Sequence, residues 1–175
     1  MINCKDDIEL GSSKKELIVG VGEMAVSGNP NTIIKTYGLG SCVAVIVMDK
    51  INSIVGMVHI ALPDSKIDRG ISERRPGYFA NTGIPALIDL MIANGSIQNT
   101  GGMVVKLAGG AQTMDSDNIF EIGKRNIAAI NRVLWMNNMR PVSTDLGGNL
   151  SRTVSVCVAS GMVKIFDSSG KYWDL

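Results

Sequence analysis

One cysteine and the single histidine of the chain are placed where their side chains could react together. Cys42 begins the apolar run 42–49, and His59 lies in the next apolar run, 53–62. A thiol with an ordinary pKa of about 8.5 is a poor nucleophile at neutral pH. A neighbouring imidazole can accept its proton, which leaves more reactive thiolate to attack an amide carbon.

The turn between the two runs decides whether the side chains meet. If the runs form an antiparallel hairpin with an even-numbered loop centred between Lys50 and Ile51, Cys42 lies directly opposite His59. Directly opposed residues have Cβ atoms about 4.5–5.5 Å apart. A loop with an odd number of residues breaks this facing, so the hairpin suggests the pair and does not establish it.

The segment before the cysteine is rich in small residues. Gly38, Gly40 and Ser41 leave the backbone N–H groups near Cys42 clear of bulky side chains, as a site for a developing oxyanion requires. A catalytic imidazole usually has its tautomer fixed by a third group at the other ring nitrogen. Thr36 and Ser41 are the candidates for that group.

Both reactive residues also have an ordinary structural interpretation. A cysteine at the end of an apolar strand is often a small core residue. His59 is flanked by Val58 and Ile60, and it can likewise be a core histidine whose ring is hydrogen-bonded. From the residue types alone, the catalytic and the structural interpretations both stay open.

The composition limits the other classes of function. The 175 residues are 45% hydrophobic and 19% charged, which is typical of one globular domain. The net charge is +1, and the lysines and arginines are scattered, which argues against nucleic-acid binding. No apolar run approaches the roughly 20 residues that span a bilayer, so we expect no membrane insertion. With one histidine, no zinc-site spacing is present, and we expect no metal.

The cysteines and the start of the chain indicate the compartment. Cys4, Cys42 and Cys157 are too few and too far apart for a disulfide framework. The first 16 residues, MINCKDDIELGSSKKE, are polar and charged and contain no apolar segment typical of an export signal. We therefore expect a cytoplasmic protein with reduced thiols.

Apolar stretches that alternate with turn signals predict an α/β fold. Strands are expected at 16–26, 42–49, 53–62, 103–111 and 141–148, and two strand-like runs joined at Ser160-Gly161 are expected within 152–167. Helices are expected at 81–95 and 122–138. The polar residues 64–77 predict a mobile surface loop. Because the strands occur in adjacent pairs at both ends, we expect a mixed sheet. The expected organisation is a flexible lead-in at 1–15, one domain at 16–167 and a tail at 168–175.

The sequence around the cysteine and histidine resembles the signature of the CheD family. Residues 35–45, KTYGLGSCVAV, are similar to its T-x-G-L-G-S-C element, and residues 56–63, GMVHIALP, to its G-x-x-H-x-x-L-P element. Further similar segments are YFANTGIPAL (78–87), KLAGGA (106–111), IGKRNI (122–127) and GGN (147–149) with Arg152. The resemblance covers about residues 17–167. One departure is Asn81, which stands where an acidic residue is expected.

The resemblance implies a fold, an activity and partners. The implied fold is a single-domain, three-layer α/β/α arrangement with a mixed sheet, related to the catalytic domains of the cytotoxic necrotizing factor toxins. The implied activity is cofactor-free hydrolysis of particular glutamine side chains in methyl-accepting chemotaxis receptors, which gives glutamate and ammonia through a cysteine thioester. The family's catalytic triad corresponds to Cys42, His59 and Thr36. A CheC-type phosphatase, which acts on phosphorylated CheY, is a second implied partner.

Two alternatives to receptor deamidation remain at this point. The protein can be a regulatory binding module that docks on chemoreceptors or a CheC-type phosphatase and has little or no hydrolase activity. It can also be a related hydrolase that acts on a glutamine of another protein. The presence of all three triad residues favours a hydrolase.

Overall fold

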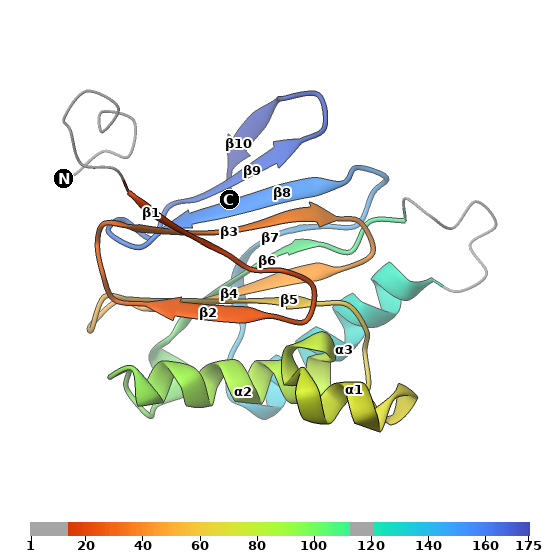
Figure 1. Cartoon of the computed structure of the whole chain (residues 1–175), viewed down its shortest axis with the longest axis horizontal. Helices are drawn as coiled ribbons and strands as arrows, with labels where there is room; N and C mark the ends of the chain where they lie inside the picture. Colours follow the sequence, from red (N-terminus) through yellow and green to blue (C-terminus); the bar gives the residue numbers. More distant parts are fainter. Residues whose placement is uncertain (1–13, 113–120) are drawn as a thin grey trace.

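The computed structural model describes residues 14–112 and 121–175, and this part of the chain forms two five-stranded sheets with helices on one side (Figure 1). Sheet A has the strand order β1-β3-β8-β9-β10, and sheet B has the order β2-β5-β4-β6-β7. Both sheets are mixed, because β1 and β3 pair in parallel in sheet A, as do β6 and β7 in sheet B, while the remaining pairs are antiparallel.

The elements have the following bounds. The strands of sheet A are β1 (Lys15–Ile18), β3 (Thr32–Leu39), β8 (Arg152–Cys157), β9 (Val163–Asp167) and β10 (Tyr172–Asp174). The strands of sheet B are β2 (Met24–Ser27), β5 (Ile54–Ile60), β4 (Val43–Asp49), β6 (Val104–Gly109) and β7 (Pro141–Leu146). The α-helices are α1 (Arg69–Arg74), α2 (Ala80–Ala93) and α3 (Ile122–Met136), and short 3-10 turns are η1 (Ser65–Ile67), η2 (Pro76–Tyr78) and η3 (Thr100–Gly102).

Sheet B is the middle layer of the molecule. Every residue of its central strands β4 and β5 is buried, which explains why their sequences are almost wholly apolar. Successive side chains of β4 point to opposite faces of the sheet. Val43 and Val45 pack beneath the helices with Leu87, whereas Ala44 and Ile46 pack between the two sheets.

The α/β class and the mixed strand directions of a single domain are confirmed, but the order of the layers differs from the predicted α/β/α arrangement. The layers are sheet A, sheet B and helices, so a second sheet lies where a second helical layer was expected (Figure 1). One reason is that the segment 16–26, predicted as one strand, is divided between β1 in sheet A and β2 in sheet B. Gly22, with φ of +74°, lies in the turn that separates them.

Two segments that were expected outside the regular structure belong to it. The predicted loop 64–77 contains α1, and the Asp68 carboxylate caps that helix by accepting from the N–H of Ile71 at 2.9 Å. In the predicted tail 168–175, β10 pairs with β9, and Trp173 packs against the core between the sheets. The boundary at residue 167 is therefore not an edge of the fold. Most of the predicted lead-in 1–15 lies outside the described residues.

The turn between β4 and β5 is closed by a buried carboxylate. Asp49 accepts hydrogen bonds from the N–H groups of Ile51 and Asn52 at 3.0 and 3.1 Å within the turn. It also accepts from Ser96 Oγ and the N–H of Ile97 at 2.8 and 2.9 Å, which ties the turn to the segment after α2. Burial alone raises the pKa of Asp49, but these hydrogen bonds outweigh it and hold the pKa well below its usual range. The charged carboxylate thus fixes the loop length and the strand register.

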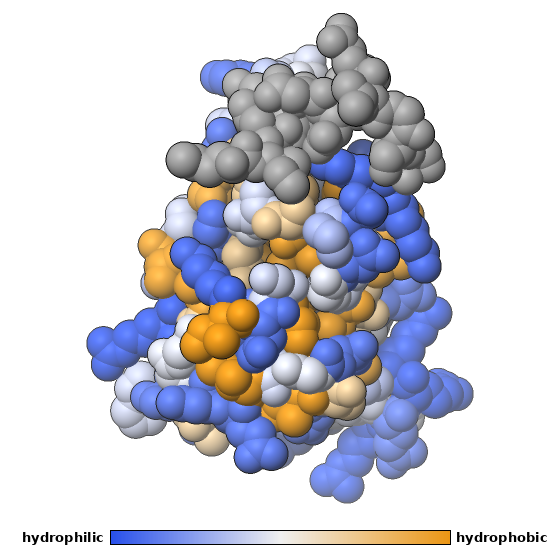
Figure 2. All heavy atoms as spheres, turned by 90° about the vertical axis from the view of Figure 1, so that its left-hand side faces the viewer, coloured by the Kyte–Doolittle hydropathy of each residue, from blue (hydrophilic) through white to orange (hydrophobic). Residues whose placement is uncertain are grey.

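Apolar and hydrophilic side chains are mixed on the described surface at the end drawn on the left of Figure 1. Figure 2 shows this end, where apolar surface is interrupted by hydrophilic side chains. The large hydrophobic side chains that are exposed include Ile51, Trp135 and Met136. In the described part of the chain, no helix has the length and apolar character needed to cross a membrane.

Candidate active site

A hydrogen bond between two buried side chains joins the two sheets. Thr36 lies in β3 of sheet A and His59 in β5 of sheet B, and they are 0% and 2% exposed. The hydroxyl Oγ1 of Thr36 lies 2.8 Å from Nδ1 of His59. Both side chains point into the layer between the sheets, because residues two apart in a strand share a face. Thr36 lies two residues after Ile34, and His59 two residues after Met57, and both of these apolar residues belong to the core between the sheets.

The partners of the Thr36 hydroxyl determine the tautomer of His59. The hydroxyl donates to the carbonyl of Val19 at 2.7 Å. Since a hydroxyl has a single hydrogen, it must accept the proton of His59 Nδ1. The tautomer assigned from this network therefore has its lone pair on Nε2. This nitrogen is buried, and among the described residues it has no hydrogen-bond partner.

Cys42 lies on the same face of sheet B as His59, one step along the strand. The β4–β5 register places Ala44 opposite His59, so Cys42 is a diagonal neighbour of the ring instead of its direct partner. The predicted register is wrong by two residues, because the loop is formed by residues 50–53. A shift of two leaves both side chains on the face between the sheets. Within the described structure no hydrogen bond joins the thiol to the ring.

Burial sets the protonation states of the reactive pair. Burial raises the pKa of the Cys42 thiol, and contact with its own backbone N–H only partly offsets this effect. Burial also lowers the pKa of His59 to about 4, against an opposing effect of the Val19 carbonyl. The pair at rest is therefore a neutral thiol and a neutral imidazole, and not the thiolate expected from the sequence.

The glycine-rich segment takes the chain from one sheet to the other. The pairing of β3 with β8 is interrupted between Thr36 and Leu39, where Gly38 has φ of +66°. The N–H of Gly40 donates to the carbonyl of Gly38 at 2.9 Å, which closes a tight bend. This bend allows Thr36 to remain in sheet A while Cys42 begins the neighbouring sheet.

The glycines after β6 lie against the backbone of the cysteine. The N–H of Gly110 donates to the Cys42 carbonyl, and the N–H of Ala111 donates to the Gly40 carbonyl, each at 2.7 Å. A Cβ atom at Gly109 would collide with the Cys42 carbonyl oxygen. The close approach of the two backbones therefore requires glycine at this position.

Asn126 is a residue of the site that the sequence motifs did not assign. It is 0% exposed in α3, and its Nδ2 donates to the carbonyls of Ser41 at 2.9 Å and Ala61 at 2.8 Å. The signal for it was present in the sequence, because Asn126 shares a spacing of four with the buried Ile130 and Leu134. A polar residue on the inward face of a helix indicates a specific hydrogen-bonding role.

Two residues from the family-like segments of the sequence, Arg152 and Asn81, do not contact Cys42 or His59 through any hydrogen bond of the described structure. Arg152 is ion-paired with Asp145 at 2.8 Å and donates to the carbonyl of Gly147 at 3.0 Å, while the N–H of Gly147 donates to Gly109 at 2.9 Å. This chain of contacts supports the glycine turn beside Cys42. Asn81 is exposed at the start of α2, and its amide hydrogen-bonds Ser65 in η1.

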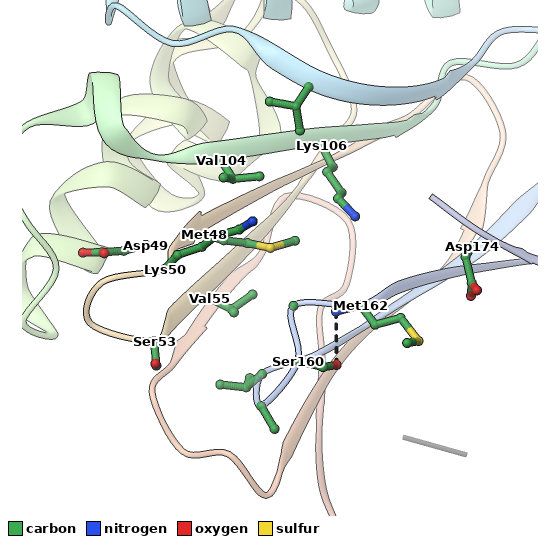
Figure 3. A pocket seen from close by; sticks show the side chains of 14 residues that line it. Met48, Asp49, Lys50, Ser53, Val55, Val104, Lys106, Ser160, Met162 and Asp174 are labelled. Carbon is green, nitrogen blue, oxygen red and sulfur yellow. Dashed lines mark hydrogen bonds between the residues drawn. The ribbon is translucent and has the colours of Figure 1, made fainter. Parts of the chain in front are cut away.

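A cavity of about 670 Å³ lies at the end of the two-sheet sandwich opposite to Cys42, because the β4–β5 turn lines it. Figure 3 shows the side chains that line this cavity. It is lined by the β4–β5 turn, including Lys50 and Ser53, by Lys106, and by Ser160 and Met162 of the β8–β9 turn. None of the six predicted site residues lines it, so it is not the candidate active site. Among the described residues, no group of three histidine, cysteine, aspartate or glutamate side chains is placed to hold a metal ion.

Comparison with known proteins identifies related sequences. Residues 61–166 match the family model described as "CheD chemotactic sensory transduction". A Syntrophotalea carbinolica protein named "Probable chemoreceptor glutamine deamidase CheD" is 45% identical over 91% of this chain and 99% of its own length. A Syntrophus aciditrophicus protein named "Probable chemoreceptor glutamine deamidase CheD 1" is 38% identical with the same coverage.

Comparison with solved structures includes a distant likeness. The crystal structure of the Bacillus licheniformis hypothetical protein YfiH aligns with a TM-score of 0.43 and 11% identity. The alignment covers 80% of this chain and 61% of that one. This likeness is too weak to support any conclusion about function.

The depressed pKa of His59 predicts a specific dependence of stability on pH. Between about pH 4 and the unfolded pKa of about 6.5, the unfolded state binds a proton that the folded state does not. The free energy of unfolding should therefore fall as the pH is lowered through this window, by up to about 1.4 kcal/mol per pH unit. Urea denaturation of the wild type and of His59→Asn at several pH values gives the difference between their free energies of unfolding. The contributions of the carboxylates, which both proteins contain, cancel in this difference. A difference that does not change between pH 6.5 and 4 would contradict the buried neutral ring.

Proposed function

The chain belongs to the CheD family, and from this premise we propose that it hydrolyses glutamine side chains of methyl-accepting chemotaxis receptors to glutamate and ammonia. The main supporting observation is the Thr36–His59 hydrogen bond. It leaves Nε2, on the same face of sheet B as Cys42, without a hydrogen-bond partner among the residues that the structure describes. A core histidine that served packing alone would have both ring nitrogens satisfied.

In the proposed first half of the reaction, the sulfur of Cys42 attacks the amide carbon of the glutamine while Nε2 of His59 accepts the thiol proton. Because the pair at rest is neutral, attack and proton transfer take place together. An imidazolium with a pKa of about 4 is a stronger acid than an ordinary one. It protonates the departing nitrogen, the C–N bond breaks, and ammonia leaves behind a thioester on Cys42.

In the second half, water attacks the thioester carbon and His59 Nε2 accepts a proton from that water. The C–S bond breaks, the proton returns to the sulfur, and glutamate leaves. Thr36 keeps the Nδ1 proton in place throughout, so Nε2 is the nitrogen that exchanges protons. The cycle consumes the amide and one water, and it requires no cofactor.

The setting of the reaction is also a proposal. We place the reaction in the cytoplasm, because a reducing environment keeps the thiol of Cys42 available for attack. A CheC-type phosphatase as a second partner is supported by the family resemblance. The alternative of a binding module without hydrolase activity is disfavoured by the presence and arrangement of Cys42, His59 and Thr36.

The proposed nucleophile is tested by Cys42→Ala. This variant should release no ammonia from receptor fragments and should retain its fold, because the change deletes only the sulfur. The assay combines ammonia release with mass spectrometry of the receptor, which detects conversion of an amide to a carboxylate. Cys157→Ala is the matched control, since Cys157 lies in β8, and it should retain activity within about twofold. Wild-type rates in Cys42→Ala would remove Cys42 from the reaction, and a wild type that binds receptor without releasing ammonia would favour the binding module.

The role of Thr36 is tested by a pair of substitutions. Thr36→Val preserves the shape but removes the acceptor of the His59 Nδ1 proton, so kcat should fall about tenfold or more. Thr36→Ser keeps the hydroxyl and should restore much of the rate, with little change in KM in either variant. If Thr36→Val turns over nearly normally, the Val19 carbonyl alone holds the ring, and the hydroxyl has no part in the mechanism.

A further inference from the structure

Three consecutive carbonyl groups around the nucleophile are all held by hydrogen bonds. Gly40 accepts from the N–H of Ala111 at 2.7 Å, Ser41 from Nδ2 of Asn126 at 2.9 Å, and Cys42 from the N–H of Gly110 at 2.7 Å. The backbone on both sides of the Cys42 nitrogen is therefore fixed. In contrast, no backbone carbonyl of the described residues accepts from the N–H groups of Ser41 or Cys42.

The bond from Asn126 determines where the N–H of Cys42 points. The carbonyl of Ser41 and the N–H of Cys42 belong to one planar trans peptide unit, in which the two groups point in opposite directions. Asn126 lies in α3, which packs on the helix side of sheet B. The N–H of Cys42 is thus turned away from α3, toward the layer between the sheets where the Cys42 side chain packs.

The same amide also acts on the strand that contains the base. Nδ2 of Asn126 donates its second hydrogen to the carbonyl of Ala61, two residues after His59. Because the carbonyls of Ser41 and Ala61 can only accept hydrogen bonds, the side-chain group of Asn126 that faces them is assigned as NH₂ and not as the oxygen. Oδ1 of Asn126 is buried and, among the described residues, has no partner. A buried acceptor of this kind costs about 1–3 kcal/mol, which argues that the residue serves the site more than the stability of the fold.

We infer that Asn126 is a positioning residue for an oxyanion site. By holding the Ser41–Cys42 peptide, it aims the N–H of Cys42 at the oxygen that gains negative charge when the Cys42 sulfur attacks a carbonyl carbon. Its hydrogen bond to the Ala61 carbonyl holds the end of β5 against the same side-chain amide. One side chain therefore fixes the position of the strand end that carries His59 relative to Cys42. The identity of the natural substrate rests on the proposed function, whereas the orientation of the Ser41–Cys42 peptide unit does not depend on it.

The test compares two reactions of the Cys42 sulfur, only one of which forms an oxyanion. p-Nitrophenyl acetate acylates the sulfur through a tetrahedral oxyanion and releases p-nitrophenolate. Iodoacetamide alkylates the same sulfur by displacing iodide, with no oxyanion. Both rates are measured for the full chain, and the Cys42→Ala protein supplies the blank for the other thiols. A role confined to packing would change both rates by a similar factor.

Asn126→Ala should lower the rate of acylation about 10- to 100-fold and change the rate of alkylation by no more than about twofold. Asn126→Ser keeps one donor and should give an intermediate acylation rate. The matched control is Asn131→Ala, on the same helix, where the exposed amide donates only to the Ile127 carbonyl at 3.0 Å. Both of its rates should equal those of the wild type.

The inference is overturned if acylation by Asn126→Ala is unchanged, or if acylation and alkylation fall by the same factor. If Asn126→Ala does not fold, the ratio of the two rates in Asn126→Ser decides in the same way. A wild type that is acylated at Cys42 but releases no ammonia from receptors would reject the proposed function. That result would leave the comparison of the two reagents intact.

Discussion

The hydrogen bond between Thr36 and His59 links the fold to the chemistry. It spans two sheets, so it forms only when sheet A and sheet B are packed in one relative position. Its acceptor is fixed in turn by Val19, which precedes the turn that takes the chain from β1 to β2. The bend at Gly38 and Gly40 then takes the chain from sheet A to sheet B. Thr36 and Cys42 therefore face the layer between the sheets from opposite sides, although they are only six residues apart.

The buried position of the pair explains its electrostatics. Moving an isolated charge into an apolar layer is strongly unfavourable, so the thiol and imidazole are both neutral at rest. In the proposed reaction, the neutral ring is a modest base toward the thiol, and the imidazolium that forms during attack is a strong acid toward the leaving nitrogen. Hydrogen bonds fix the carbonyls at Gly40, Ser41 and Cys42. In the proposed mechanism, the N–H of Cys42 stabilises the developing charge and so compensates for the weak base.

The catalytic roles assigned from the sequence remain predictions, and the structure shows how those residues are placed. Thr36 was one of two candidates for the group that orients the ring of His59, and the structure places its hydroxyl 2.8 Å from Nδ1 of that ring. The hairpin register could not be predicted, because the loop length depends on Asp49, whose carboxylate binds Ser96 and Ile97 far along the chain. Such a contact leaves no local signal in residues 42–62.

The layer order was missed for a similar reason. A glycine-containing apolar segment such as 16–26 has the same pattern whether it is one strand or two strands in different sheets. The role of Asn126 depends on the packing of α3 against the ends of β4 and β5, which periodicity alone cannot place. Motifs that were separate in the sequence, at 106–111 and 122–127, meet at the backbone of Cys42.

The most direct test of this account is ¹⁵N NMR of the imidazole ring. His59 is the only histidine of the chain, so its two ring nitrogens can be assigned without ambiguity. The account predicts a neutral ring at pH 7 with the proton on Nδ1 and none on Nε2, and a titration midpoint of about 4. A proton on Nε2 at pH 7, or a midpoint near the ordinary value of about 6.5, would contradict it.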